Sequence, residues 1–298
     1  MYRVEAEATV KDFEISNASL DEFINNLQLK IISKTASSIE FDILNCHPSI
    51  ANTLRRILIS KVPTMAIHYV SVYENNTVFP DEYIAHRLGL IPLEANPEYF
   101  SYFKDEETFE NVLNFRIDKT ADKEPVNLMS DDIEFVPAEG QDHFSFRFKP
   151  NVLVCKMVPG NQVEMTFKAI KGRGEQHAKW SPVSLCSYRI MPKIILEKDF
   201  YGEDAKELQA CFSPGVIEII NNKAVVANPR LESMSREALR HEKFKDSVKI
   251  LRESGWFCFN VETITLDPIQ VLKMGLEELI RSCKELKEEV RLEGESYG

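Results

Sequence analysis

Apolar residues recur at helical spacing in two separated parts of the chain. The first lies between Ser49 and Lys61, where Pro48 suits the opening turn of a helix and Pro63 ends it. One apolar stripe runs along this segment at positions i, i+4, i+7 and i+8, formed by Ile50, Leu54, Ile57 and Leu58. The spacing predicts an amphipathic helix over 49–61 that must bury one face.

The second apolar seam is longer and follows a helix start at Asp267–Pro268. Its members recur at alternating steps of three and four, as helix pairing of the coiled-coil kind requires. They are Ile269, Leu272, Leu276, Leu279, Cys283, Leu286 and Val290. A sheet beneath the helix would explain the first turns equally well, but the seam is longer than any sheet it would cover. We therefore expect its distal half to contact a partner.

Apolar runs bounded by turn residues predict strands through much of the remaining chain. A polar turn at 33–38 interrupts the first run, and the polar stretch 120–141 is expected to be a loop with one short strand. The predicted strand segments are 29–43, 66–73, 112–117, 144–148, 152–156, 163–169 and 256–263, and residues 211–231 are expected to form a strand, a turn and another short strand. Their alternation predicts a β-rich domain with one solvated face.

Two further helices are predicted from capping residues. Asp81 is placed to cap a helix that ends at Gly89, after a hairpin turn at Asn75–Asn76. Ser235 is placed to cap a helix that runs to Ser254. The basic residues of this last helix are balanced by acidic ones, which favours a solvated face over a DNA-binding one.

Composition limits the possible functions. The 298 residues include 44% hydrophobic and 28% charged residues, as in an ordinary globular protein of one or two domains. The net charge of −11 argues against broad binding to nucleic acid, because phosphate neutralisation needs clustered Lys and Arg. Any action on DNA or RNA is therefore expected to go through partners.

Residues 1–10 match neither a signal nor a transit peptide, and no apolar run approaches the roughly 20 residues that span a bilayer. We expect a soluble, intracellular protein.

The six cysteines are widely spaced, and none forms a CxxC pair. Zinc sites and iron–sulfur clusters normally bring their thiolates in close pairs. The sequence therefore predicts reduced, mostly buried thiols, with no metal and no other cofactor.

The segment 171–194 contains the candidate catalytic residues of the sequence. Lys171, Arg173 and Lys179 stand among glycines, but their spacing matches neither a P-loop nor a dinucleotide-binding fingerprint. His177 lies near Lys179 without a visible nucleophile, so a structural histidine is favoured over a general base. The alternative of a free-standing enzyme using His177 and Lys179 predicts a concave pocket with a perturbed pKa around both side chains.

Several phrases of the sequence resemble one known family. ANTLRRILISKVPTMAI, followed by DEYIAHRLGLIPL, resembles the signature segment of the α-like subunits of cellular DNA-dependent RNA polymerases. HAKWSP resembles a surface loop of the eukaryotic members. SPGVIEI, ANPRL and FCFNVET most resemble the larger α-like subunit shared by RNA polymerases I and III. The counterparts in RNA polymerase II and in archaea remain alternatives, although the close cysteine quartets of those proteins are missing here.

The resemblance implies an α+β fold in which a dimerisation domain of two separated segments carries an inserted β-rich domain. The implied bounds are 29–64 and 255–298 for the dimerisation domain and 65–254 for the insertion. Residues 1–28 would form an extension that is mobile or bound to a partner.

The resemblance also implies a non-catalytic assembly subunit that supports rRNA, tRNA and 5S rRNA transcription in the nucleus, with polymerase I in the nucleolus and polymerase III in the nucleoplasm. It would heterodimerise with a smaller α-like subunit through Ile50, Leu54, Ile57, Leu58, Leu276, Leu279, Cys283 and Leu286. It would dock the second-largest subunit and small zinc-binding subunits through Arg55, Arg56, Asp81, Glu82, His86, Arg87, His177, Lys179 and Trp180. None of its residues would be catalytic.

Overall fold

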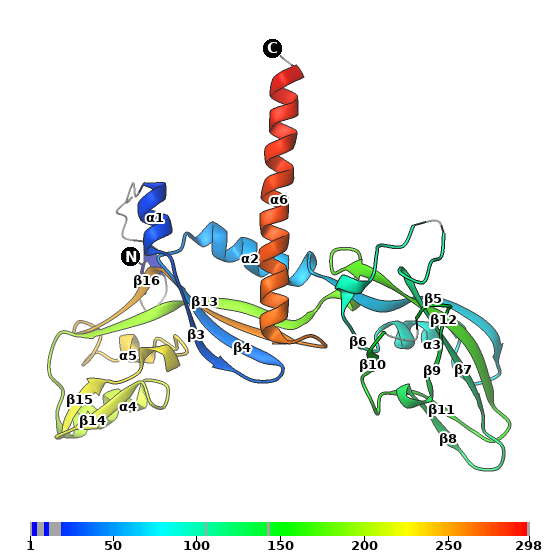
Figure 1. The fold of residues 1–298 in the computed structure, drawn as a ribbon. Coiled ribbons are helices and arrows are strands. Elements are labelled where there is room, and N and C mark those ends of the chain that lie inside the picture. The colour runs from blue at the N-terminus through cyan, green and yellow to red at the C-terminus, as the bar shows by residue number, and fades with distance from the viewer. Residues whose placement is uncertain (1, 5–8, 12–18, 105, 142–143, 297–298) are drawn as a thin grey trace. The chain divides into compact units, whose positions relative to one another are not determined.

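The computed structural model describes residues 2–4, 9–11, 19–104, 106–141 and 144–296. The chain forms two compact units (Figure 1). Unit 1 comprises residues 1–33, 40–52 and 187–260, and unit 2 comprises residues 34–39, 53–186 and 261–298. Helices and antiparallel strands both contribute, so the predicted α+β class is confirmed. In the described part of the chain, no helix combines the length and the apolar character needed to cross a membrane.

Unit 1 contains most of a six-stranded sheet, whose strands β3, β4, β13 and β16 continue into unit 2. The path through the sheet is β2 (Thr9–Lys11), β1 (Tyr2–Val4), β16 (Val248–Thr263), β4 (Ser38–Leu44) and β3 (Gln28–Lys34), with β13 (Val183–Leu196) also paired to β16. Strand β1 runs antiparallel to β16, with Tyr2 opposite Arg252. In the core of unit 1, the rings of Phe41 and Phe259 stack with centroids 4.9 Å apart.

A buried ion pair stabilises this core. The Asp42 carboxylate, 1% exposed, accepts from Arg230 Nη1 at 2.5 Å and from Trp256 Nε1 at 2.9 Å. A charge at this depth is tolerated only when it is paired and hydrogen-bonded. The pair therefore links β4 and β16 to η4 (Pro229–Leu231) within unit 1.

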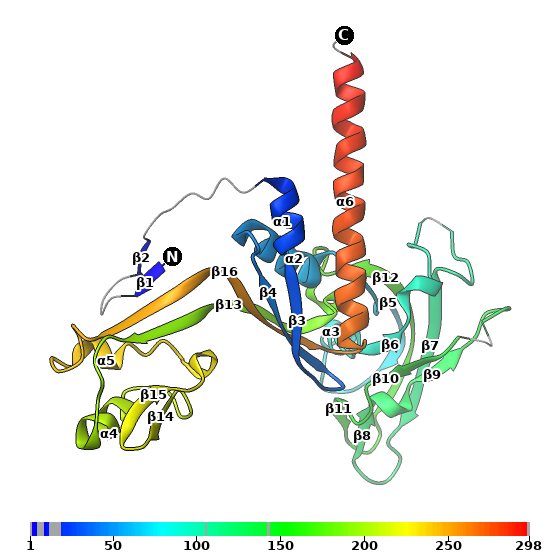
Figure 2. The same ribbon diagram turned by 60° about the vertical axis from the view of Figure 1, so that its left-hand side comes forward.

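The rest of unit 1 is a small helical layer with its own core. Figure 2 shows two short helices gathered around a hairpin, α4 (Gly202–Ala210) and α5 (Glu237–Arg240) around β14 (Ile217–Ile220) and β15 (Lys223–Val226). Phe200 meets Phe244 edge to face at 5.4 Å in this core. Near the N-terminus, α1 (Leu20–Asn26) begins with a capping box between Ser19 and Glu22.

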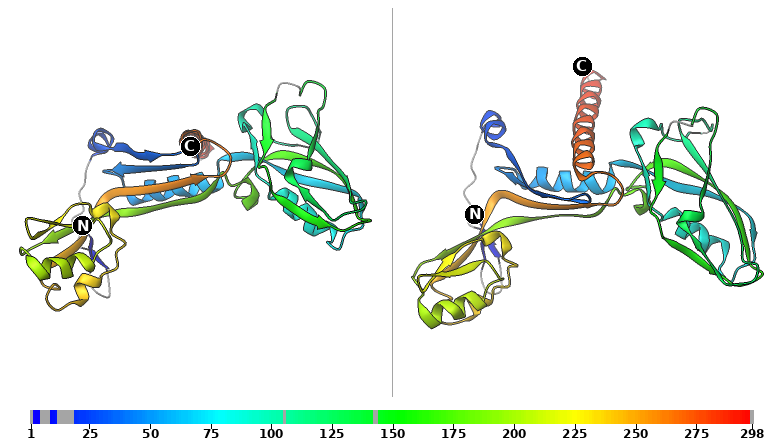
Figure 3. Two further views of the ribbon diagram at one scale, coloured as in Figure 1. Left: turned by 90° about the horizontal axis from the view of Figure 1, so that it is seen from below. Right: turned by 60° about the horizontal axis from the view of Figure 1, so that its bottom comes forward.

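Unit 2 is built on a four-stranded antiparallel sheet, seen from two further directions in Figure 3. Its order is β5 (Pro63–Asn75), β12 (Gln162–Arg173), β7 (Val112–Thr120) and β9 (Glu134–Val136). Two short ribbons and one helix complete the core: β6 (Leu93–Ala95) with β10 (Phe146–Phe148), β8 (Val126–Met129) with β11 (Leu153–Met157), and α3 (Asp81–Gly89). Phe115 lies at the centre, with four other phenylalanine rings within 6 Å. The remaining single turns of unit 2 are η1 (Pro97–Tyr99), η2 (Ser130–Asp132) and η3 (Ala178–Trp180).

Two helices correspond to the apolar stripes of the sequence. Helix α2 (Pro48–Ser60) runs from unit 1 into unit 2, and α6 (Pro268–Ser296) belongs to unit 2. The Asp267 carboxylate caps α6 by accepting from the backbone of Ile269 at 2.8 Å. The two helices meet closely, because a Cβ on Gly275 would lie 2.5 Å from Leu58 Cδ2. Both predicted helices are thereby confirmed.

The glycines at 172 and 174 are explained by packing. A Cβ on Gly172 would lie 2.4 Å from the Trp180 indole, and a Cβ on Gly174 would lie 2.3 Å from the Ile59 carbonyl oxygen. Gly172 thus lets the η3 turn lie flat on β12, and Gly174 lets the end of β12 touch the backbone of α2. A close approach of protein segments, rather than a phosphate, accounts for both residues.

Some sequence predictions are wrong. The helix expected from Ser235 ends at Arg240, because Val248 and Ile250 are buried alternately on strand β16. No hairpin forms at Asn75–Asn76, since β5 pairs with the distant β12 and the chain continues into α3.

Asp81 is likewise not the predicted cap. It is the first residue of α3, and its carboxylate accepts from Asn75 Nδ2 at 2.7 Å. Strand β13 and helix α4 were not predicted. The expected extension 1–28 falls partly outside the described residues, and its described parts are β1, β2 and α1.

We predict that Gly174→Ala destabilises the protein by about 1–3 kcal/mol, because the new methyl group would force two backbone segments apart. Chemical denaturation measures this change in the free energy of unfolding. Gly89→Ala is the matched control, since its nearest neighbour lies at an ordinary 3.5 Å. Equal stability of the two variants would contradict the close contact.

Candidate functional site

The residues predicted for the first helix lie mostly inside the chain. Leu54, Ile57 and Leu58 on α2 are buried, and Leu58 is fully covered beneath Gly275 of α6. Ile50 alone of the four is exposed, at 37%. The stripe therefore packs α2 within this chain, and Ile50 is the member that presents apolar surface.

The second seam behaves differently along its length. Val271 and Leu272 are buried near the start of α6, Leu279 is half-buried, and every described residue from 281 to 291 is exposed. Figures 1 and 2 show these last turns of α6 (red) standing clear of the other elements of unit 2. The exposed apolar side chains of the helix beyond its base are Leu276, Ile280, Cys283, Leu286 and Val290. Ile280, 54% exposed, was not predicted, although its i+4 spacing from Leu276 would have revealed it.

The base of α6 is fixed in unit 2 by polar contacts as well. Glu278 has an 11% exposed side chain and lies 3.6 Å from Arg173 Nη2 at the end of β12. Arg173 in turn donates from Nε to the Tyr102 hydroxyl at 2.9 Å. The exposed stripe thus projects from a helix whose first turns are held by apolar packing and by an ion pair.

The charged residues predicted to dock other subunits divide into two groups. Asp81 and Arg87 are engaged within the chain, the latter by donating to the Leu153 carbonyl and lying 5.9 Å from the Tyr83 ring. Arg55 is half-buried near Cys186, whose thiol pKa burial raises to about 12 while the Arg55 charge opposes the rise. Arg56, Glu82 and His86 are exposed, and so is Asp81 despite its hydrogen bond to Asn75.

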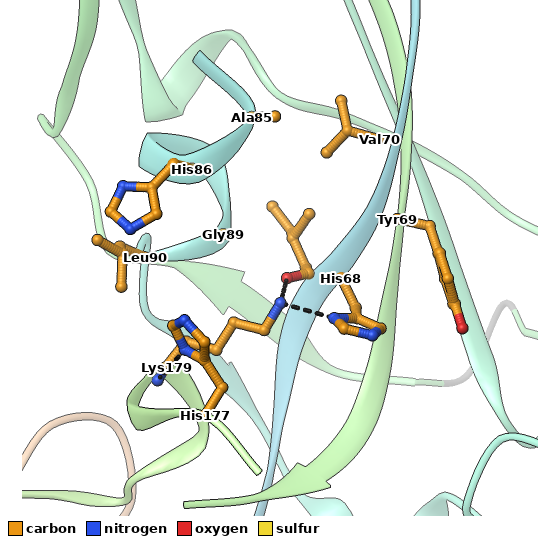
Figure 4. A pocket seen from close by; sticks show the side chains of 10 residues that line it. His68, Tyr69, Val70, Ala85, His86, Gly89, Leu90, His177 and Lys179 are labelled. Atoms are coloured by element: carbon orange, nitrogen blue, oxygen red, sulfur yellow. Dashed lines mark hydrogen bonds between the residues drawn. The ribbon is translucent and has the colours of Figure 1, made fainter. Parts of the chain in front are cut away.

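Three of the predicted docking residues meet at one pocket of unit 2. His86 comes from α3, and His177 and Lys179 come from the η3 turn and its cap. The pocket measures about 430 Å³ and is lined by Ile67, His68, Tyr69, Val70, Ala85, His86, Gly89, Leu90, His177 and Lys179. Figure 4 shows the Lys179 stem crossing this space toward His68, with the rings of His86 and His177 beside it. We call it the Lys179 pocket.

The Lys179 ammonium is held by uncharged partners. Its Nζ donates to the Ile67 carbonyl at 2.7 Å, lies 2.9 Å from His68 Nδ1, and stands 4.5 Å from the Trp180 ring centroid. Burial lowers the Lys179 pKa to about 8. Burial also lowers the His68 pKa, and the charges of Lys179 and His177 lower it further.

Trp180 has a structural role in the η3 turn. Its side chain is 3% exposed, and its Nε1 donates to the Ile170 carbonyl at 3.1 Å. The ring covers Gly172 and thereby orients the η3 turn that carries Lys179. Of the three residues predicted in this loop, His177 and Lys179 are the ones that face open space.

The lining of the Lys179 pocket limits its chemistry. It supplies imidazole and ammonium groups, but no Ser, Thr, Cys, Asp or Glu that would act as nucleophile or as partner of a general base. Tyr69 carries the one hydroxyl among the lining residues, and Figure 4 shows its ring directed away from His86 and His177. The geometry therefore suits binding of an acidic group more than covalent catalysis.

Metal binding finds no support in the described part of the chain, where no three His, Cys, Asp or Glu side chains gather closely enough to hold an ion. Five cysteines are buried singly, and Cys283 is exposed on α6.

Comparison with known proteins identifies the class. The chain belongs to the RNA polymerase Rpb3/Rpb11 dimerisation domain family, which matches residues 40–283. It is 37% identical to the human subunit RPAC1 of DNA-directed RNA polymerases I and III, covering 91% of this chain and 86% of the human protein. The Saccharomyces cerevisiae counterpart is 35% identical, with 89% and 90% covered. Similarity to the RNA polymerase II subunit rpb3 of Dictyostelium discoideum, 34% identical, extends over 59% of this chain. The resemblance noted in the sequence is confirmed.

We predict that Lys179 makes the stability of the folded chain depend on pH. The folded chain releases the Lys179 proton near pH 8, whereas the unfolded chain keeps it up to the ordinary pKa of 10.5. Because the unfolded state binds more protons in this window, the free energy of unfolding rises as pH increases from 8 toward 10.5.

Denaturation of the wild type and of Lys179→Met across this window measures the effect. The wild type should gain stability relative to the variant as pH rises. Lys123→Met, at an exposed position, is the control and should keep the wild-type slope. A constant difference between the wild type and Lys179→Met would contradict the lowered pKa.

Proposed function

We propose that this chain is the larger α-like subunit of RNA polymerases I and III and that it serves in assembly rather than in catalysis. The observation that carries the proposal is the exposed apolar stripe of α6 above its anchored base. A contiguous apolar surface of this kind marks a protein–protein interface. The similarity to RPAC1 over most of both chains supplies the identity of the assembly.

The first partner in this proposal is the smaller α-like subunit. Its helix would lie along Leu276, Ile280, Leu286 and Val290 of α6. Ile50 on α2 is proposed separately as a contact with the same subunit. The dimerisation domain would consist of residues 29–64 and 255–298, and residues 65–254 would form the insertion. An amphipathic helix laid along an apolar face needs anchors at the i, i+3 and i+4 spacing that α6 presents.

Further partners would be the second-largest subunit and the small zinc-binding subunits. Exposed Arg56, Glu82 and His86, with the Lys179 pocket, offer charged and polar contacts for them. Such contacts mainly set register and specificity. A subunit of these two polymerases works in the nucleus, with polymerase I in the nucleolus and polymerase III in the nucleoplasm.

The pocket favours one other function enough to test it. A free-standing enzyme requires a concave site with perturbed pKa values, and the Lys179 pocket has both. It lacks a nucleophile and an orienting carboxylate among its lining residues. Hydrolytic or group-transfer activity of the isolated chain that disappears in Lys179→Met would favour the enzyme.

Native mass spectrometry of the endogenous complex tests the main proposal. We expect one copy of this chain with one smaller α-like subunit, inside assemblies that contain two different sets of large subunits. A stable monomer or homodimer without polymerase subunits would refute it. A single set of large subunits, that of polymerase II, would reassign the chain to that enzyme.

We predict that Leu286→Asp weakens binding of the smaller subunit at least 30-fold, since a central apolar anchor contributes about 2 kcal/mol or more. Leu286 is 61% exposed, so the substitution should leave the fold of the isolated chain intact. Co-expression and quantitative pull-down measure the affinity, and circular dichroism measures the fold.

Lys284→Gln is the matched control. It lowers the net charge by one unit, as Leu286→Asp does, but at a position about 200° around the helix. It should bind normally. Equal loss in both variants would point to charge rather than to the apolar stripe, and no loss in either would remove α6 from the interface.

A further inference from the structure

The Lys179 pocket contains a cation that lacks an acidic partner in the described part of the chain. Its Nζ contacts a carbonyl oxygen and an imidazole nitrogen, and no described carboxylate oxygen lies within 4 Å of it. Within unit 2, Lys61, Lys119 and Lys168 each pair with a carboxylate, whereas half-buried Lys171 donates to the Phe100 carbonyl. Lys179 differs from Lys171 in lining an open pocket together with three imidazoles.

The histidines of the pocket are placed to donate hydrogen bonds. His177 Nδ1 accepts from the Lys179 backbone N–H at 3.1 Å, so its neutral ring carries the proton on Nε2. His68 Nδ1 faces the Lys179 ammonium, which likewise assigns the proton of that ring to Nε2. His86 reaches the pocket from α3. The pocket thus gathers donors of hydrogen bonds and offers them no acidic acceptor of its own.

The shape and polarity of the pocket suit a group with one negative charge on a short aliphatic stem. Ile67, Val70 and Leu90 supply apolar walls, and Lys179 is the only Lys or Arg among the lining residues. Phosphate sites usually combine several Arg, Lys or backbone N–H groups. The helix end at this pocket is the C-terminus of α3, whose partial negative charge disfavours a dianion more strongly than a monoanion.

We propose that the Lys179 pocket binds the side-chain carboxylate of an Asp or Glu from another subunit. Lys179 forms the ion pair, and His86 and His177 donate to the carboxylate oxygens. The inference rests on the proposed function, because it requires a neighbouring subunit to deliver the acid. In this proposal the basic residues of the pocket together bind one acidic side chain of the neighbouring subunit.

Pairing would offset the cost of leaving the Lys179 charge half-buried without a counter-charge. A charge-assisted hydrogen bond to a carboxylate is about twice as strong as a neutral hydrogen bond. Here it would form in a pocket from which solvent is partly excluded, which strengthens the electrostatic attraction. The carboxylate also favours the charged form of every cation around it. The titratable groups around it are Lys179, His68, His86 and His177. Tyr69 also lines the pocket, but its ring is directed away from His86 and His177.

Carbodiimide cross-linking of the endogenous complex tests the proposal directly. This reagent activates a carboxylate and joins it to an amine in contact, so it reports ion pairs between Lys and Asp or Glu. We expect mass spectrometry to find Lys179 joined to an Asp or Glu of another polymerase subunit. We also expect Lys179 to be labelled by acetic anhydride at least tenfold less in the complex than in the isolated chain.

Each other outcome has a defined meaning. If Lys179 is labelled equally in complex and isolated chain, the pocket is open in the assembly and the inference fails. If Lys179 is protected but no cross-link forms, a non-acidic group covers it, and the inference again fails while the assembly function stands. If no polymerase subunit accompanies the chain, the proposed function itself fails.

Substitutions give a second, independent readout. Lys179→Met should weaken binding of the subunit identified by cross-linking at least tenfold. Lys179→Arg should retain most of the wild-type binding. Lys123→Met is the control and should have no effect. Exchange of charges, with Lys179→Glu and the partner acid changed to Lys, should recover binding that either change alone removes. Thermal melting of each isolated variant separates loss of contact from loss of fold.

Discussion

The close contact between α2 and α6 at Gly275 is the constraint on which unit 2 depends. With a hydrogen in place of a side chain, Gly275 lets α6 settle on Leu58, while the Asp267 cap and the Arg173–Glu278 pair fix its start and its first turns. Tertiary packing rather than intrinsic propensity normally stabilises a helix. Here that packing is confined to the base, and the remaining turns are left to present the side chains of the apolar stripe.

The end of strand β12 connects this helix to the second functional region. Gly172 supports Trp180 and with it the turn that carries Lys179, Arg173 reaches Glu278, and Gly174 touches α2. A few consecutive residues thus position both the apolar stripe and the Lys179 pocket. Sites held by strands and helices are more rigid than sites on free loops, which suits the proposed role in assembly.

Local pattern predicted the two apolar helices and singled out His86, His177 and Lys179, but it did not place His68 and His86 beside Lys179. The helix over 49–61 and the seam after Asp267 follow from short-range spacing and capping, and the structure contains both. Strand β16 was mistaken in part for a helix because its pairing with β1 comes from the other end of the chain. No local sequence pattern predicts that His68 belongs to the site, because only the pairing of β5 with β12 brings it to Lys179. The sequence also does not reveal that Leu54, Ile57 and Leu58 are buried within the chain. An apolar stripe has the same pattern whether it packs against the same chain or against a partner.

The exposed turns of α6 have a consequence for the life of the chain before assembly. Described residues 281–291 extend about 16 Å of helix into solvent, at 1.5 Å per residue, with Leu286 and Val290 more than half exposed. Such surface favours self-association and recognition by quality-control proteases. A partner that covers this helix would therefore also control the abundance of the chain. The amount of the chain would then follow the supply of that partner rather than the rate at which the chain itself is synthesised.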